Sequence, residues 1–530
     1  MVTNYLKISK ASDLENKKDR FLYRFFEILP GVLAWGTLIT VVTMSFVIPV
    51  AIAIFIIIFD VYWFVKTVYL SLHLRTGFAQ VRYNMTVDWL ERLKQLNSEK
   101  YILKDTDSWQ KIYHLVLLPT YKEGSDVIGA AIDGLLNANY PKERMVVVIG
   151  QEERAGKDFN AAVKQDIESK YRDRFLKLDF VEHPADIPGE LAGKGSNIAW
   201  SGKYATKEIV DKMGLKYEHV LVSAFDVDTV AFREYFSRLT YAYLTAKDPV
   251  HSFYQPVPFY TNNIWHAPSF ARVVAFSATF WHTIKQEMIE TDTSFSSHTE
   301  PLRALVDVDF WQTNMVSEDS RIFWQCFFRY DGNYVGEALY YPVSMDANVA
   351  HSFWQTMINV YKQQRRWGYG VENLPYLLFN FHKNKLIPWW RKFIISARML
   401  ERFWSWATNA LLIFFLGWLP IIVGGSDFNQ SVLSFNLPRL TRIIMSVAMF
   451  GLITSAVFSI IILPPKPPRY GRFKYLWMIL QWLIFPATTI LLGSIPGLEA
   501  QTRLMFGKYM GFWVTPKVRK YSDLGQTEKD

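Results

Sequence analysis

Two aspartates, Asp226 and Asp228, directly follow an apolar run of strand-forming residues that begins at His219. Such a run predicts a buried parallel strand, and α/β sheets bind ligands at the carboxyl ends of their parallel strands. Carboxylates there could hold Mg²⁺ or Mn²⁺ and the diphosphate that the cation neutralises. The same Asp-x-Asp spacing occurs at 105–107 and 307–309, but only the copy at 226 ends a clean strand. The alternative is an ordinary turn after a strand.

A second acidic pair, Glu318 and Asp319, stands at the start of a predicted amphipathic helix, within Val316-Ser-Glu-Asp-Ser-Arg321. Acidic residues are favoured at this position by the helix dipole alone, which is the structural alternative. The chemical interpretation is a catalytic pair in which Asp319 is the general base. It would take a proton from an acceptor hydroxyl group.

Two glycine- or proline-containing stretches carry groups suited to a nucleotide. Leu118-Pro-Thr-Tyr-Lys-Glu123 follows the first predicted strand, and Gly193-Lys-Gly-Ser-Asn197 offers a mobile loop with a cation and an amide for a diphosphate. A plain strand-to-helix turn and a surface loop are the alternatives. The side chains expected at the donor nucleotide are Thr120, Tyr121, Glu123, Lys194 and Asn197.

Gln363-Gln-Arg-Arg-Trp367 ends a helix-like segment that begins near Ser352. Gln363 and Arg366 could contact a departing diphosphate, and the flat face of Trp367 could stack on a sugar ring of the acceptor. A basic helix lying on lipid headgroups needs the same residue types, so that interpretation also stays open.

Residues 101–343 alternate short apolar strands with amphipathic stretches. This pattern predicts an α/β fold, a doubly wound and mostly parallel sheet with helices on both faces. The expected elements are strands at 113–119, 145–149, 178–181 and 219–225, with a helix at 127–136.

The ends of the chain are much more apolar than this middle part. Between Pro30 and His73 the residues suffice for two membrane crossings, at about 1.5 Å per residue, with a reversal near 45–49. Further spans are expected at 403–423 and 443–463. The stretch 475–495 is interrupted by Pro486, and a full crossing would leave the basic tail outside. A broken or re-entrant segment is therefore expected there.

The expected organisation is a protein of the plasma or inner membrane with several spans. The net charge is +9, but the basic residues cluster beside apolar spans, which indicates a cytoplasmic α/β domain and no nucleic-acid partner. The single cysteine, Cys326, excludes an internal disulfide. The expected parts are a tail (1–27), two membrane helices (28–74), the α/β domain (75–350), amphipathic interface helices (351–402), membrane segments (403–497) and a cytoplasmic tail (498–530).

Taken together, the five motifs resemble those of membrane-integral family 2 glycosyltransferases, in the order that this family has them. They are P-x-Y-x-E, Lys-x-x-Asn, Asp-x-Asp, Ser-Glu-Asp and Gln-x-x-Arg-Trp, spread over 113–370. The resemblance implies a GT-A fold and an inverting, metal-dependent transfer of a sugar from a UDP-sugar. It departs from the family at the end of the second strand, where Glu152 or Glu153 stands in place of the aspartates that contact the base.

Near the end of the chain, Phe512-Trp-Val-Thr-Pro-Lys517 looks like the gating loop of bacterial cellulose synthases. That resemblance implies that Thr515 and Lys517 lie near the diphosphate, and that the enzyme is processive, like cellulose or hyaluronan synthases. The alternative is a basic tail. Cellulose synthases usually continue through more membrane helices and a cyclic-dinucleotide-sensing domain, so a complete cellulose-type channel is not expected.

The residues also fit other functions. The same motifs occur in enzymes that add a single sugar to a lipid acceptor. A transporter or scaffold that binds nucleotides without turnover is a third possibility. The expected partners are a UDP-sugar, a saccharide or lipid acceptor and the lipid bilayer; accessory subunits cannot be deduced from the residues.

Overall fold

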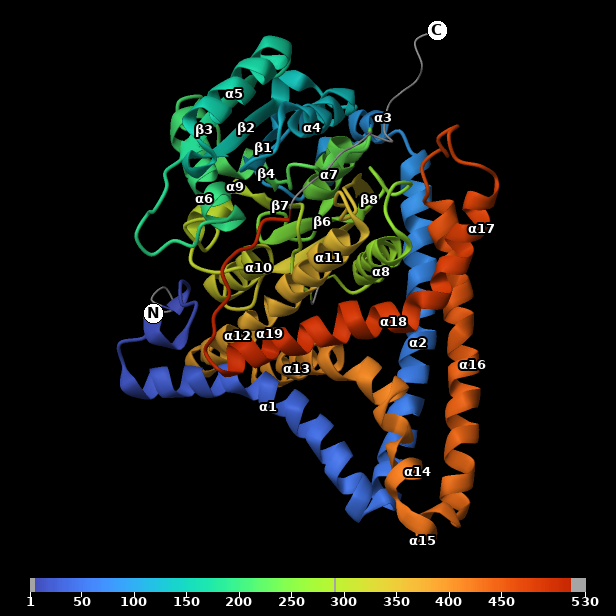
Figure 1. The fold of residues 1–530 in the computed structure, drawn as a ribbon. Helices are drawn as coiled ribbons and strands as arrows, with labels where there is room; N and C mark the ends of the chain where they lie inside the picture. Colours follow the sequence, from blue (N-terminus) through green and yellow to red (C-terminus); the bar gives the residue numbers. More distant parts are fainter. Residues whose placement is uncertain (1–4, 290–291, 516–530) are drawn as a thin grey trace.

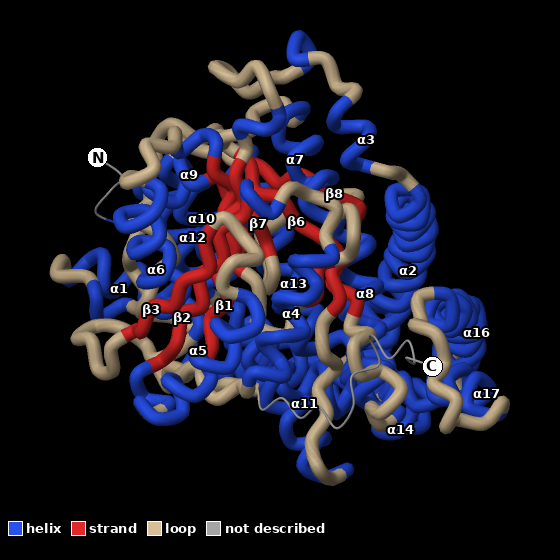
Figure 2. The backbone as a smooth tube through the Cα atoms, turned by 90° about the horizontal axis from the view of Figure 1, so that it is seen from above, coloured by secondary structure: helices blue, strands red, loops and turns tan. Residues whose placement is uncertain are grey.

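The computed structural model describes residues 5–289 and 292–515, and its centre is an eight-stranded sheet. The strand order is β3-β2-β1-β4-β7-β6-β8-β5. Figure 2 shows this sheet enclosed by helices. The strands are β1 Tyr113–Thr120, β2 Met145–Glu152, β3 Lys177–His183, β4 Val220–Ala224, β5 Val230–Ala231, β6 Ser252–Phe259, β7 His298–Pro301 and β8 Val335–Ser344.

The first half of the sheet confirms the predicted α/β pattern. Strands β1 to β4 pair in parallel, and β1, β2 and β4 are almost wholly buried because helices cover both of their faces. Along β1, Leu115 and Leu117 pack into one core while Val116 and Leu118 pack into another. This alternation explains why the strands are apolar at nearly every position.

The second half of the sheet is mixed: β5 and β7 run opposite to the other strands, so the sheet combines parallel and antiparallel pairs. Strand β7 runs antiparallel to β4 and to β6, and β5 runs antiparallel to β8, while β6 and β8 are parallel. The antiparallel direction of β7 decides what lies at the end of β4. His298 at the start of β7 pairs with Ala224 at the end of β4, so the loop before β7 lies beside Asp226.

Helices of the α/β domain lie around the sheet (Figure 1). They are α3 Trp89–Lys94, α4 Ser125–Asn137, α5 Lys157–Tyr171, α6 Lys194–Ala205, α7 Tyr235–Thr245, α8 Ser269–Gln286, α9 Leu302–Asp307, α10 Glu318–Arg329, α11 Phe353–Gly368 and α12 Asn373–Lys383. Helix α11 begins where the sequence predicts, with the side chain of Ser352 accepting a hydrogen bond from the Gln355 amide.

Two long apolar helices precede the domain. Helix α1 (Lys17–Val47) and helix α2 (Pro49–Thr86) are separated only by Ile48, so the reversal lies within the predicted stretch. Both are long and apolar enough to cross a membrane. Helix α2 continues through residue 74 to Thr86, and Asn84 near its end donates hydrogen bonds to backbone carbonyls at β8. One helix thus joins the apolar region to the sheet.

The predicted span at 403–423 is a bent pair. Helix α13 (Trp389–Phe414) is followed by the Leu416–Val423 segment, which includes α14 (Leu419–Val423), with a bend of 50° between the two. Beyond the short α15 (Gly425–Asn429), α16 (Val432–Ile461) covers the next predicted span. In Figure 1, α16 runs alongside α2.

The last apolar stretch, Phe473–Met505, also passes the test of length and composition for a membrane span. It contains α17 (Phe473–Leu480), α18 (Phe485–Thr489) and α19 (Ile495–Met505). In Figure 1, α18 and α19 run across the direction of α2 and α16, below α8 and α11. Glu499 on α19 is held by Arg365 and Tyr361 of α11, each at 2.7 Å. The chain therefore returns to the α/β domain at α19.

Candidate functional site

The carboxylate of Asp226 lies at the carboxyl end of β4 and faces two other segments. Its Oδ1 atom is 2.5 Å from Nζ of Lys194, and its Oδ2 atom accepts a hydrogen bond of 2.6 Å from the Ser296 hydroxyl group. Lys194 belongs to the first turn of α6, and Ser296 to the loop before β7. Three parts of the chain that are distant in sequence therefore meet at Asp226.

Asp228 is more deeply enclosed, with only 1% of its surface exposed. Its Oδ2 atom accepts a hydrogen bond of 3.0 Å from the backbone amide of Asp346, just after β8. The side chain of Asn262 donates to the Asp228 carbonyl and to the Asp346 carboxylate, both at 2.9 Å. These bonds fix the orientation of the Asp228 carboxylate.

The two aspartates fit a cation that arrives with a phosphate ligand. In the described part of the chain, no three His, Cys, Asp or Glu side chains form a metal-binding group. Mg²⁺ at nucleotide sites is usually held by one or two carboxylates, with phosphate oxygens and water as the other ligands. Asp226 and Asp228 supply those two carboxylates, so the residues present fit a diphosphate-bound cation and do not fit a structural metal site.

Asp319 is linked to Asp226 through a single residue, Ser296. Its Oδ2 atom accepts a hydrogen bond of 3.0 Å from the Ser296 amide, while the Ser296 hydroxyl group donates to Asp226. Ser296 therefore bridges the two carboxylates. Its backbone has φ +43°, a left-handed conformation that costs about 1–3 kcal/mol in a residue other than glycine and is typical of functional sites. Asp319 remains partly accessible.

Glu318, the neighbour of Asp319, is 2% exposed. Burial, with a smaller contribution from the Asp319 charge, raises its pKa from 4.5 to about 8. At neutral pH Glu318 is therefore mostly protonated and cannot serve as the base. Of the two predicted catalytic residues, Asp319 is the one whose geometry suits proton removal.

The buried Glu318 predicts a measurable pH dependence of stability. Because its pKa is higher in the folded than in the unfolded chain, the stability that it contributes is complete below pH 4.5 and is lost as the pH rises through about 8. As the pH rises through this window, the unfolding free energy of the wild-type protein should fall more steeply than that of Glu318→Gln. The difference should be up to about 1.4 kcal/mol per pH unit. Thermal unfolding at pH 6, 7 and 8 measures the difference.

Glu300 contributes to the pH dependence of stability in the wild-type protein and in Glu318→Gln alike. Burial raises the pKa of Glu300 to about 8 as well, so its share of the fall in unfolding free energy should be the same in both proteins. Glu143→Gln, at an exposed position, is the control and should have the wild-type slope. Equal slopes in all three proteins would show that Glu318 ionises normally.

Lys194 is the cation of the site. Burial by itself lowers the pKa of its ammonium group, but the carboxylates of Asp226, Glu318 and Asp319 raise it above the ordinary value. Lys194 therefore stays charged. Nearby, burial and the charge of Lys194 lower the pKa of His298 to about 4, and this neutral ring holds the Ser296 carbonyl through Nδ1 at 2.8 Å.

The Lys194–Asn197 stretch forms the first turn of α6, so the predicted mobile loop is wrong. The physical reason is packing: Gly195 lies against Glu318, and an added Cβ there would be 2.9 Å from Glu318 carbons. The side chain of Asn197 donates hydrogen bonds to the Gly150 carbonyl at 2.9 Å and to Glu152 at 3.1 Å. The helix thereby places Lys194 and Asn197 on one edge of the sheet.

The predicted nucleoside residues gather at the ends of β1 and β2. Thr120 donates to the Gly150 carbonyl at 3.3 Å, and Glu123 accepts from the Tyr121 amide at 2.8 Å. Glu152 is buried and ion-paired with Arg154 at 2.9 Å, and the Arg154 guanidinium lies 4.5 Å from the centroid of the Tyr121 ring.

Hydrogen bonds from His183 and Asn197, together with the Arg154 charge, overcome burial and lower the pKa of Glu152. Glu153 instead accepts a hydrogen bond of 2.9 Å from the Ala185 amide. Of the two glutamates, Glu152 is therefore the one that contacts Asn197.

The end of α11 closes another side of the site. Gln363 and Trp367 line a small pocket together with Tyr260 and Asp346, and the Trp367 and Tyr260 rings are 6.4 Å apart. Burial raises the pKa of Tyr260, with further contributions from the charges of Asp226 and Asp228. The α11 motif and the two aspartates therefore surround the same tyrosine.

Residues 511–515 of the tail return to this site. The Phe512 ring lies 4.9 Å from the Arg366 guanidinium, and Phe512 packs on Gly193. The Thr515 hydroxyl is buried without a hydrogen-bond partner among the described residues. Lys517, the other predicted tail residue, lies outside the described residues.

Neither protein-family models nor curated proteins match this chain. Among solved structures, it is similar to a mannosyltransferase, PcManGT, from Pyrobaculum calidifontis, in complex with GDP-Man and Mn²⁺. The identity is 13%, the TM-score is 0.38, and 74% of this chain and 99% of the other are covered. It is also similar to S. aureus TarS 1–349 in complex with UDP-GlcNAc, at 14% identity and a TM-score of 0.35, over 66% and 92% of the two chains. Likenesses at this level assign neither an activity nor a substrate.

Several residues of the site escape sequence reasoning. Ser296, His298, Asn262 and Asp346 come from loops and strand ends that carry no recognised motif. Only Thr293-Ser-Phe-Ser-Ser297, a cluster of hydroxyl side chains directly before β7, offers a signal. Its place beside Asp226 follows from the pairing of β7 with β4.

Proposed function

We propose that this chain is a membrane-bound, inverting glycosyltransferase that moves a sugar from a UDP-sugar to a growing polysaccharide. The observation that carries the proposal is the Ser296 bridge, which links the carboxylate expected at the metal and diphosphate, Asp226, to the expected base, Asp319. A nucleotide-binding scaffold without turnover has no need for a partly accessible carboxylate held at that place.

In the proposed reaction, Asp228 and Asp226 would hold Mg²⁺ or Mn²⁺, and the bound cation would neutralise negative charge on the diphosphate. Lys194 and Arg366 add positive charge where the leaving group becomes more negative. Glu152, Asn197, Thr120 and Tyr121 hold the nucleoside end.

The acceptor stacks on Trp367, and its hydroxyl oxygen attacks the anomeric carbon as the bond to the diphosphate oxygen breaks. The hydroxyl proton passes to Asp319. Direct displacement converts an α-linked donor into a β-linked product. UDP leaves with the electron pair of the bond that breaks, so no redox partner is needed.

The contacts of Phe512 favour a role for residues 511–515 in closing the donor site. Phe512 covers Gly193, the residue before Lys194, and touches Arg366, so movement of the tail would change two groups assigned to the diphosphate. Thr515 follows three residues later. We assign the tail, with Lys517, to donor retention during repeated transfers.

Gly193→Ala tests this assignment. The new Cβ would lie 2.6 Å from Cγ of Phe512, so the ring must move. The Gly193 backbone is extended, so the effect arises from the contact alone. We expect the KM for the donor to rise about tenfold, equivalent to about 1.4 kcal/mol of lost binding.

A double-mutant cycle separates this contact from a general disturbance. In a Phe512→Ala background, Gly193→Ala should change the KM less than twofold. Gly511→Ala, which has no atom within 4 Å of the new Cβ, is the control. Equal effects of Gly193→Ala in both backgrounds would contradict a role for Phe512.

The activity itself is tested with the purified full chain. It is given a panel of UDP- and GDP-sugars with Mn²⁺ or Mg²⁺, nucleotide release is measured, and labelled products are separated by size. A ladder of products supports the processive enzyme. A single labelled lipid would instead identify the transfer of one sugar to a lipid acceptor, and absence of nucleotide release with every donor would contradict sugar transfer.

A further inference from the structure

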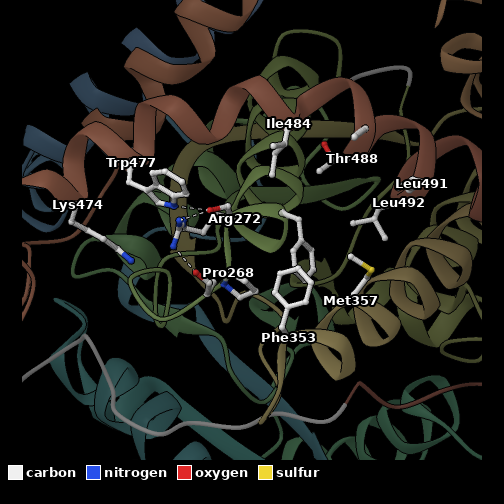
Figure 3. Close-up of a pocket in the computed structure, with 14 residues that line it drawn as sticks. Pro268, Arg272, Phe353, Met357, Lys474, Trp477, Ile484, Thr488, Leu491 and Leu492 are labelled. Atoms are coloured by element: carbon white, nitrogen blue, oxygen red, sulfur yellow. Dashed lines mark hydrogen bonds between the residues drawn. The ribbon is translucent and has the colours of Figure 1, made fainter.

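A cavity of about 510 Å³ lies outside the proposed catalytic centre. It is enclosed by the start of α8, the start of α11 and the α17–α18 stretch (Figure 3). The wall is almost entirely apolar and includes Phe270, Phe353, Met357 and Leu492. Its volume is within the range of sites that bind small molecules.

Two cations stand at one end of this apolar cavity. In Figure 3, Lys474 and Arg272 lie on one side, with Pro268 and Trp477, while Met357 and Leu492 lie on the other. The cavity therefore has the polarity of an amphiphilic molecule, with positive charge where a headgroup would lie and apolar side chains where a hydrocarbon chain would lie.

Arg272 is an unusual cation because only 2% of its surface is exposed. In the described part of the chain its hydrogen bonds go to neutral oxygens: Gln481 Oε1 at 2.6 Å, the Ala267 carbonyl at 2.5 Å and the Ser269 hydroxyl at 3.1 Å. A buried charge without an opposite charge is costly, so the site favours an anion. Burial also lowers the pKa of Arg272, to about 10.

The surroundings of the cavity supply apolar surface on the outside of the protein. Phe473 is 82% exposed and Leu483 71%, on the same stretch whose other face lines the cavity. This stretch is apolar enough for a membrane span, and it follows a basic loop containing Lys466, Arg469 and Arg472. Apolar surface beside a cluster of cations is typical of contact with an anionic bilayer surface.

We propose that this cavity binds one anionic phospholipid of the bilayer, with its phosphate at Lys474 and Arg272 and an acyl chain between Phe353, Met357 and Leu492. The lipid is a resident ligand and not the sugar acceptor. Helix α11 runs from Phe353 past Met357 toward Trp367, so the cationic end of the cavity is the end away from Trp367. The proposal does not rest on sugar transfer.

Native mass spectrometry of the detergent-solubilised full chain tests the proposal. Dioleoyl phosphatidylglycerol is compared with dioleoyl phosphatidylcholine, which has the same chains but no net charge. One phosphatidylglycerol should bind, at least about tenfold more tightly than phosphatidylcholine. Lys474→Glu should weaken phosphatidylglycerol binding about tenfold or more, since each cation near an anionic lipid contributes about 1 kcal/mol.

Matched variants separate the two ends of the site. Arg472→Glu makes the same charge change in the same basic segment but outside the cavity wall, and should change binding less than twofold. Ala487→Trp fills the cavity from α18 and should abolish binding. Leu483→Trp, on the exposed face of the same stretch, should not.

The outcomes are distinct. Equal binding of the two phospholipids, equal effects of Lys474→Glu and Arg472→Glu, or retained binding in Ala487→Trp would each overturn the proposal. Displacement of the lipid by millimolar inorganic phosphate alone would show a simple phosphate site and would also overturn it. Loss of nucleotide release in Asp319→Asn reports on the proposed enzyme and not on this cavity, so the two proposals fail separately.

Discussion

Asp319→Asn should lower kcat by about 10²–10⁴-fold, the usual contribution of a general base, while the affinity for the donor changes little. Asparagine preserves the size of the side chain and can still accept the hydrogen bond that the Ser296 amide donates. It cannot take the acceptor proton. Nucleotide release measures kcat, and titration of the nucleotide-sugar measures binding.

The control for this variant is Asp309→Asn. Asp309 belongs to another Asp-x-Asp copy, is exposed, and pairs with Lys203 at 2.7 Å outside the site. Its backbone has φ +59°, which asparagine tolerates well. The control should retain near-wild-type activity. If Asp319→Asn keeps more than a tenth of the wild-type kcat, another residue is the base.

Asp228→Asn is expected to remove metal-dependent turnover, with a loss on the order of 100-fold or more, because a cation at a phosphoryl group supplies several kcal/mol. The buried carboxylate is held in place by the Asp346 amide. The measurement is nucleotide release over a range of Mn²⁺ concentrations. Higher Mn²⁺ should restore part of the activity if the variant binds the cation more weakly.

Asp107→Asn is the matched control, because Asp107 stands second in the remaining Asp-x-Asp copy. It is exposed and pairs with Lys111 at 2.7 Å. Its Mn²⁺ dependence should equal that of the wild type. Because Asp228 is buried, its substitution could destabilise the fold. Thermal unfolding of both variants therefore checks that each protein is folded. A folded Asp228→Asn protein with unchanged Mn²⁺ dependence would rule out Asp228 as a metal ligand.

Local patterns were sufficient to predict the parallel half of the sheet. Strands β1 and β2 begin at the predicted residues, and β3 and α11 begin within one residue of prediction. These elements are apolar on both faces or on one helical stripe, and such periodicity depends only on neighbours in sequence. The reversal between α1 and α2 was predictable for the same reason, because the length of an apolar stretch limits where a helix can turn.

The mixed half of the sheet could not be predicted in this way. Strands β6, β7 and β8 take their places through pairing with strands far away in sequence, and β7 is only four residues long. The direction of each of these strands depends on the strand with which it pairs. The contacts of Phe473–Met505 with α11 are likewise long-range, and its composition alone does not predict them.

The sequence by itself determined which residue types could do the proposed chemistry: a carboxylate pair after β4, an acidic pair opening α10 and a basic, aromatic end to α11. Only the tertiary structure decided how they act. Antiparallel β7 brings Ser296 between Asp226 and Asp319, and burial favours the protonated form of Glu318, which leaves Asp319 as the proposed base. Both effects depend on what surrounds a side chain in space, and residue order does not contain that information.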